Sequence, residues 1–199
     1  MNLMTKHSIL ATKLAVGLLT CFLVLHSPLG VSATNGVLEK AEPHPTLRLI
    51  SKTQYLNTVQ AVFGSQIELN VRFAPVRRVD GMVTLGAAQA MVTPGALDAL
   101  DRAAHLVAAQ VLAPSYRQFI MPCQPTSNTD RDDACAHRFF AESGRFLYRR
   151  PLTNAELSTL VNVAGLGVGR AGNFYDGLER ALVGMLLSPH FLFIQERVE

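Results

Sequence analysis

Residues 93–114 read TPGALDALDRAAHLVAAQVLAP, and this stretch decides the expected fold. Thr93 followed by Pro94 is typical of a helix start, because threonine can cap free backbone N–H groups and proline suits the first helical position. The stretch ends at Pro114, which cannot continue a helix. Between these residues, apolar side chains recur at helical spacing on one face, at Leu97, Leu100, Ala104, Val107 and Val111. We therefore predict an amphipathic helix that packs against a core.

Four segments around this stretch combine a capping residue with an apolar stripe. They predict helices over residues 51–64, 132–148, 153–165 and 173–187. Two of them open with the spacing of a capping box, Ser51 with Gln54 and Thr153 with Glu156. Five helices with no run of alternating strands predict a small all-α domain.

The expected helical domain spans residues 49–199 and has two parts. The N-terminal part covers residues 49–115 and the C-terminal helical part covers residues 132–199. Residues 66–86 contain Pro75 and alternate only loosely, so we expect an irregular loop there with at most a short hairpin.

The N-terminus has the pattern of a secretory signal peptide. Lys6 and Lys13 precede or border an apolar core at residues 14–25, and small residues end at Ala33, the predicted cleavage site. The core is shorter than the roughly 20 apolar residues of a membrane span, although an uncleaved anchor is the alternative. Residues 34–48 then read as an extended leader. The sequence thus predicts a signal peptide at residues 1–33 and a periplasmic or secreted protein of the cell envelope.

Composition excludes several classes of function. The signal contains two of the 18 basic residues and none of the 15 acidic ones, so its removal lowers the net charge from +3 to +1. Such a balance gives no electrostatic footprint for nucleic acid or for an anionic membrane. The chain has no tryptophan, which argues against a surface for stacking sugars or bases. We expect no nucleic-acid partner and, after signal removal, no membrane partner.

Cys123 and Cys135 are the two cysteines that remain after cleavage at the predicted site. In an oxidising compartment such a pair favours a disulfide, and closing this loop would stabilise the fold by about 3 kcal/mol. The alternative is a metal site that includes His137. On a helix, however, positions 135 and 137 point about 200° apart, so the disulfide is the prediction.

Residues 167–172, Gly-Val-Gly-Arg-Ala-Gly, match the dinucleotide-binding pattern Gly-x-Gly-x-x-Gly. That chemistry needs a preceding strand and a parallel sheet, whereas a helical capping box lies upstream here. We therefore interpret these residues as a flexible turn between two helices and predict no cofactor.

No other group of residues forms a convincing catalytic or metal site. The histidines after the signal lack the spacing of ligand pairs, and they are His44, His105, His137 and His190. No Gly-x-Ser-x-Gly elbow is present. Arg149 and Arg150 can satisfy the carbonyls at the end of their helix. An anion site that joins them to Arg77 and Arg78 stays open, but a solvated face is favoured.

Three segments resemble a known group of proteins. They are residues 49–64, beginning LISKTQYLNTV, residues 135–156, ending YRRPLTNAE, and residues 181–193, containing LSPHFL. They resemble planctomycete-signature-type proteins, which are large secreted bacterial proteins built from serial domains of unknown function. The resemblance implies that such domains occur in proteins that also contain c-type cytochrome modules, and that related proteins continue into further domains beyond the position of Glu199. This chain has no Cys-x-x-Cys-His motif, so it cannot itself attach haem in the c-type manner.

These observations favour a non-catalytic interaction or structural module of the bacterial cell envelope. Contact with another envelope protein or domain is expected through the apolar C-terminal segment, residues 191–194, because exposed apolar patches often mark interfaces. One alternative is an accessory front-end part of a periplasmic redox protein associated with cytochrome c, with active residues in the loop 66–86 or in a neighbouring domain. The other is a truncated relic.

Overall fold

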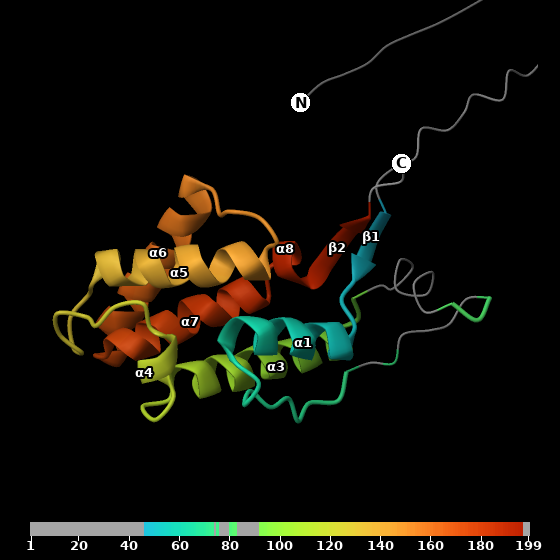
Figure 1. The fold of residues 1–199 in the computed structure, drawn as a ribbon, viewed down its shortest axis with the longest axis horizontal. Helices are drawn as coiled ribbons and strands as arrows, with labels where there is room; N and C mark the ends of the chain where they lie inside the picture. The colour runs from blue at the N-terminus through green and yellow to red at the C-terminus, as the bar shows by residue number, and fades with distance from the viewer. Residues whose placement is uncertain (1–45, 74, 76–79, 83–91, 197–199) are drawn as a thin grey trace, which may run out of the picture. The chain divides into compact units, whose positions relative to one another are not determined.

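A computed structural model of the chain describes residues 46–73, 75, 80–82 and 92–196 (Figure 1). In this part of the chain, seven helices, five of them long, accompany one small antiparallel sheet, and the predicted all-α class is confirmed. The elements are β1 (Thr46–Leu49), α1 (Lys52–Phe63), α3 (Pro94–Leu112), α4 (Arg117–Ile120), α5 (Asp133–Leu147), α6 (Asn154–Ala171), α7 (Phe174–Leu186), α8 (Pro189–Leu192) and β2 (Phe193–Glu196).

The signal peptide, its cleavage site at Ala33 and most of the leader lie outside the described residues. The last residues of the leader belong to β1. No helix in the described ranges has the length and apolar character needed to span a membrane.

Side-chain caps fix the starts of the long helices where the sequence predicts them. Ser51 and Gln54 form the predicted capping box at α1, and Thr153 and Glu156 form the one at α6. The side chains of Thr93, Asp132 and Asn173 cap α3, α5 and α7. These side-chain oxygens accept hydrogen bonds from N–H groups that have no partner inside the helix, which stabilises each helix start at that residue.

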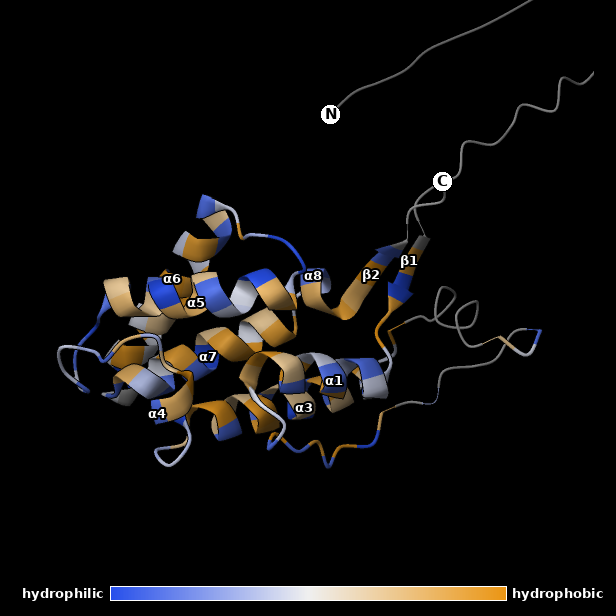
Figure 2. Ribbon diagram, in the orientation of Figure 1, coloured by the Kyte–Doolittle hydropathy of each residue, from blue (hydrophilic) through white to orange (hydrophobic). Residues whose placement is uncertain are grey.

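Helix α7 lies at the centre of the core, where it packs against α6, α3 and α5. Its predicted apolar face is fully buried, with Leu178, Leu182, Met185 and Leu186 inaccessible to solvent. Apolar residues also recur along α3 (Figure 2). The prediction is wrong for one residue of the apolar stripe of α3, since Leu97 in its first turn is 51% exposed.

The C-terminal apolar segment folds back onto the domain. Phe191 and Leu192 are buried, and Phe191 packs edge-to-face on Tyr55 with ring centroids 5.0 Å apart. Strand β2 then pairs antiparallel with β1, with Leu49 opposite Phe193. The sheet is therefore a long-range pairing of the two ends of the described domain (Figure 1). Much of the loop 66–86, where a short hairpin was expected, lies outside the described residues.

Helix α6 continues beyond its predicted end at residue 165, through the residues expected to form a turn. Glycine weakens a helix by about 1 kcal/mol per residue, which favours a turn when sequence alone is considered. Here Gly167 lies against Gly177 of α7, and a Cβ added at position 167 would stand 2.7 Å from the Gly177 Cα. Close interhelical packing thus outweighs the low propensity. The helix ends at Gly172, whose φ of 70° is left-handed.

Candidate functional site

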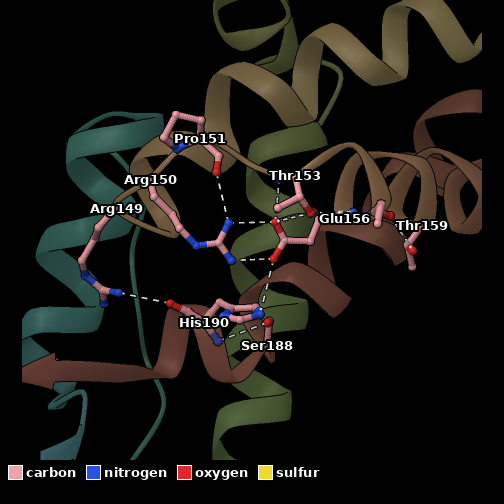
Figure 3. A network of polar contacts seen from close by, with 9 residues as sticks. Arg149, Arg150, Pro151, Thr153, Glu156, Thr159, Ser188 and His190 are labelled. Carbon is pink, nitrogen blue, oxygen red and sulfur yellow. Dashed lines mark hydrogen bonds and ion pairs between the residues drawn. The ribbon is translucent and has the colours of Figure 1, made fainter. Parts of the chain in front are cut away.

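The turn that follows α5 places two arginines side by side. The N–H of Tyr148 bonds the Gly144 carbonyl at 2.8 Å, and that of Arg149 bonds the Phe146 carbonyl at 3.3 Å. Arg149 adopts φ of 56°, in the left-handed region where glycine is usually found after a helix. This conformation sends the chain sharply toward α6 and directs Arg149 and Arg150 to different partners (Figure 3).

Arg150 forms a forked ion pair with Glu156 of α6. Its two terminal nitrogens lie 2.6 and 2.9 Å from the carboxylate oxygens, and one of them also donates to the Pro151 carbonyl. The same carboxylate accepts the backbone N–H of Thr153 at 2.8 Å in the capping box. The Arg150 fork, aided by Thr153, lowers the pKa of Glu156 from 4.5 to about 2.

His190 of α8 approaches this pair from the C-terminal segment. Its Nε2 lies 3.4 Å from a Glu156 oxygen, and its ring contacts that of Tyr148 at a centroid distance of 5.3 Å. The Ser188 hydroxyl accepts the His190 backbone N–H and so caps α8. Burial raises the pKa of Tyr148, and a hydrogen bond with Ser188 opposes that shift. The turn after α5, the start of α6 and α8 are thus linked by polar contacts.

Arg149 binds the backbone of α8 directly. Its guanidinium donates to the carbonyls of His190 at 3.2 Å and Phe191 at 2.9 Å. Burial lowers the pKa of Arg149, and the charge of Arg48 lowers it further. These contacts join the sequence segments 148–156 and 187–192, which are far apart in the chain (Figure 3).

A groove of about 560 Å³ lies beside this network, between α6, α7 and α8. Its apolar lining includes Leu160, Val163, Ala181, Leu187 and Pro189. The polar groups at its edge have partners within the chain: the Thr159 hydroxyl donates to the Ala155 carbonyl, and Glu156 is held by Arg150. The groove therefore offers apolar contact, not free polar groups.

Comparison with protein families gives one match, over residues 135–196. The matched family is described as PSD5, protein of unknown function (DUF1595). Residues 135–196 are a DUF1595 domain. The match covers the second and third segments of the resemblance, whereas residues 49–64 lie outside it, so that part stays a prediction. No curated protein and no solved structure matches the chain.

The DUF1595 domain thus contains both arginines, Glu156 and the whole of α8. Proton transfer by Glu156 near neutral pH is disfavoured, because a carboxylate with a pKa of about 2 is ionised and already bonded. The Ser188 hydroxyl serves as a cap. Among the described residues, no three His, Cys, Asp or Glu side chains cluster as a metal site would require.

The structure contains the predicted disulfide at the edge of the DUF1595 domain, with Cys123 and Cys135 joined at an S–S distance of 2.02 Å. Cys135 is buried in α5 and His137 is exposed, as the helical spacing predicts. Within the loop that the disulfide closes, the Asp132 carboxylate accepts hydrogen bonds from the backbone N–H groups of Cys135 and Thr126. These hydrogen bonds lower the pKa of Asp132.

One interpretation of the basic residues requires correction, and another is not tested. The side chains of Arg149 and Arg150 do not satisfy the carbonyls of their own helix; they bind α8 and Glu156. Arg77 and Arg78, the other members of the anion site considered from sequence, lie outside the described residues.

The association of Arg150 with Glu156 and His190 was missed by reasoning from the sequence. The position of Arg150 just before a capping box was the available signal, since it brings an arginine near the acidic cap residue. Nothing local in the sequence pointed to His190.

Proposed function

We propose that this chain is a non-catalytic module of the bacterial cell envelope that works by contact with another envelope protein or domain. The observation that carries the proposal is the apolar groove between α6, α7 and α8. Val163 at the groove is 39% exposed, and Leu166, one turn further along α6, is 64% exposed. An amphipathic helix of a partner could place its apolar side chains there.

The buried C-terminal segment changes where this contact is expected. Phe191 and Leu192 are used in the core, so they are not available to a partner. Leu187 and Pro189, which precede them, line the groove instead. The proposed contact is therefore expected at the groove and not at residues 191–194.

A structural role for the polar network supports the same proposal. Arg149 binds the α8 backbone, and His190 of α8 lies beside Glu156 of α6, so α8 is fixed against α6 and the turn after α5. Because α6 and α8 line the groove, these polar contacts hold the groove in shape. The signal-like N-terminus and the Cys123–Cys135 disulfide support a place outside the cytoplasm.

Photo-crosslinking in cells tests this function. We expect p-benzoylphenylalanine at position 163 to give a discrete adduct with one envelope protein, identified by mass spectrometry. The adduct should carry the chain without residues 1–33 and should fractionate with the envelope. Gly184 lines the groove, and a Cβ at this position would meet no atom within 4 Å, so Gly184→Leu fills the groove and should abolish the adduct.

The same crosslinker at position 97 serves as the control, because Leu97 is an exposed apolar residue on α3, away from the groove. An adduct that forms equally from positions 97 and 163, or that persists with Gly184→Leu, would contradict the proposed contact.

A further inference from the structure

A second pocket, of about 760 Å³, is lined by residues of α5, of the turn that follows it and of α6. Three arginines line it: Arg145 in the last turn of α5, and Arg149 and Arg150 in the turn that follows. Its apolar lining includes Phe146, Leu152 and Leu157. The pocket combines concentrated positive charge with an apolar surface.

The positive charge of this pocket is only partly compensated. Glu156 neutralises Arg150, whereas Arg149 bonds neutral carbonyls. Arg145 lies over the Phe146 ring, 4.8 Å from its centroid. Among the described residues, no ion pair joins a carboxylate to Arg145 or Arg149.

Arg149 lies close to a further arginine and keeps free donors. Arg48 of β1 is close enough to add to the lowering of the Arg149 pKa that burial causes. The carbonyl contacts of Arg149 use two of its five N–H donors, so the group retains donors for a ligand.

We propose that this pocket binds an anion attached to an apolar body, such as a carboxylate or phosphate on a ring or an acyl chain. Arg145 and Arg149 both line the pocket, and their planar forks are suited to the oxygens of an anionic group. The side chains of Phe146, Leu152 and Leu157 cover the apolar body. The volume falls within the range of small-ligand pockets.

Calorimetric titration of the full chain with 1-naphthyl phosphate tests the site. We expect this probe to bind at least about tenfold more tightly than 1-naphthol, which lacks the charge, or inorganic phosphate, which lacks the ring. Added salt should weaken the binding, because the pocket is open to solvent. Equal binding of naphthol would overturn the proposal.

Arg145→Gln should lower the affinity for naphthyl phosphate about tenfold. Arg138→Gln is the matched control, since Arg138 is exposed on the same helix but does not line the pocket. Circular dichroism checks that both variants fold. If Arg145→Gln unfolds the chain, Arg145→Lys keeps the charge without the fork and should still weaken binding severalfold. Unchanged affinity in the folded Arg145 variant would refute the site.

The anion could belong to a lipid headgroup or to a free small molecule. Arg145-dependent binding to phosphatidylglycerol vesicles, but not to phosphatidylcholine vesicles, would assign it to lipid. Naphthyl phosphate binding without vesicle binding would assign it to a free amphiphile. Binding to neither probe would exclude the proposed site.

Discussion

The two ends of α6 are held against the domain by opposite means. At its start, Glu156 is bound by charged and polar groups from Arg150, Thr153 and His190. Near its end, Gly167 meets Gly177 of α7 with no intervening side chain. The sequence suggests a ligand site at each end: Arg149 and Arg150 precede the start of α6, and the glycine-rich residues 167–172 lie at its end. In the structure, both position helices.

The difference between the two ends predicts how each responds to change. Close packing of backbones tolerates no added volume and is insensitive to protonation. The charged contacts can be lost one at a time, and their contribution depends on pH and on exposure to solvent. Substitutions and a fall in pH should therefore affect the two ends of α6 differently.

The largest effect is expected from Gly177→Ala. The new Cβ would overlap the Ala164 carbonyl oxygen and lie 3.0 Å from the Val168 nitrogen, and these backbone atoms cannot rotate away. Overpacking of this kind costs about 3 kcal/mol, which exceeds the gain of about 1 kcal/mol in helix propensity. Urea unfolding measures the loss.

Gly184→Ala on the same helix is the control, since a Cβ there meets nothing within 4 Å. It should stabilise the chain by about 0.5–1 kcal/mol. If both variants shift stability in the same direction, close packing does not explain the glycines.

A smaller effect is expected from protonation of Glu156. Its pKa is lowered from 4.5 in the reference state to about 2 in the fold, so the folded chain binds fewer protons than the unfolded chain. The stabilisation is complete above about pH 4.5 and is lost as the pH falls toward 2. Because Arg150 is 39% exposed, water screens the pair, and we expect a loss of about 1–2 kcal/mol.

Glu156→Gln isolates this contribution when unfolding is followed from pH 2 to 6. Asp132 also has a lowered pKa but is present in both chains, so its effect cancels in the difference. The stability difference between the parent and the variant should shrink as the pH falls. A constant difference would show that the charge of Glu156 does not stabilise the fold.

The sequence predicted the starts of the long helices because each start depends on nearby residues. Thr93 and Ser51 each cap an N–H group three positions along the chain, so the pattern can be recognised within four residues of sequence. The disulfide was predictable for another reason: Cys123 and Cys135 were the two cysteines outside the predicted signal peptide.

The errors arose where distant residues decide the structure. The end of α6 depends on Gly177, which follows the glycine-rich residues on another helix. Strand β2 exists because residues 193–196 pair with residues 46–49. Arg149 contacts α8 about forty residues away. None of these partners can be identified from local periodicity.

Arg149 provides the finest test, since it combines a charged contact with a glycine-like backbone. Its left-handed φ of 56° costs a non-glycine residue about 1 kcal/mol, while its side chain holds the carbonyls of His190 and Phe191. Arg149→Ala loses these contacts and keeps the strain. Arg149→Gly loses the contacts but relieves the strain, so it should be about 1 kcal/mol more stable than the alanine variant. Thermal unfolding should show the parent as the most stable chain, the glycine variant as the next and the alanine variant as the least stable. A glycine variant more stable than the parent would mean that the arginine contacts with α8 stabilise the fold by less than the backbone strain costs.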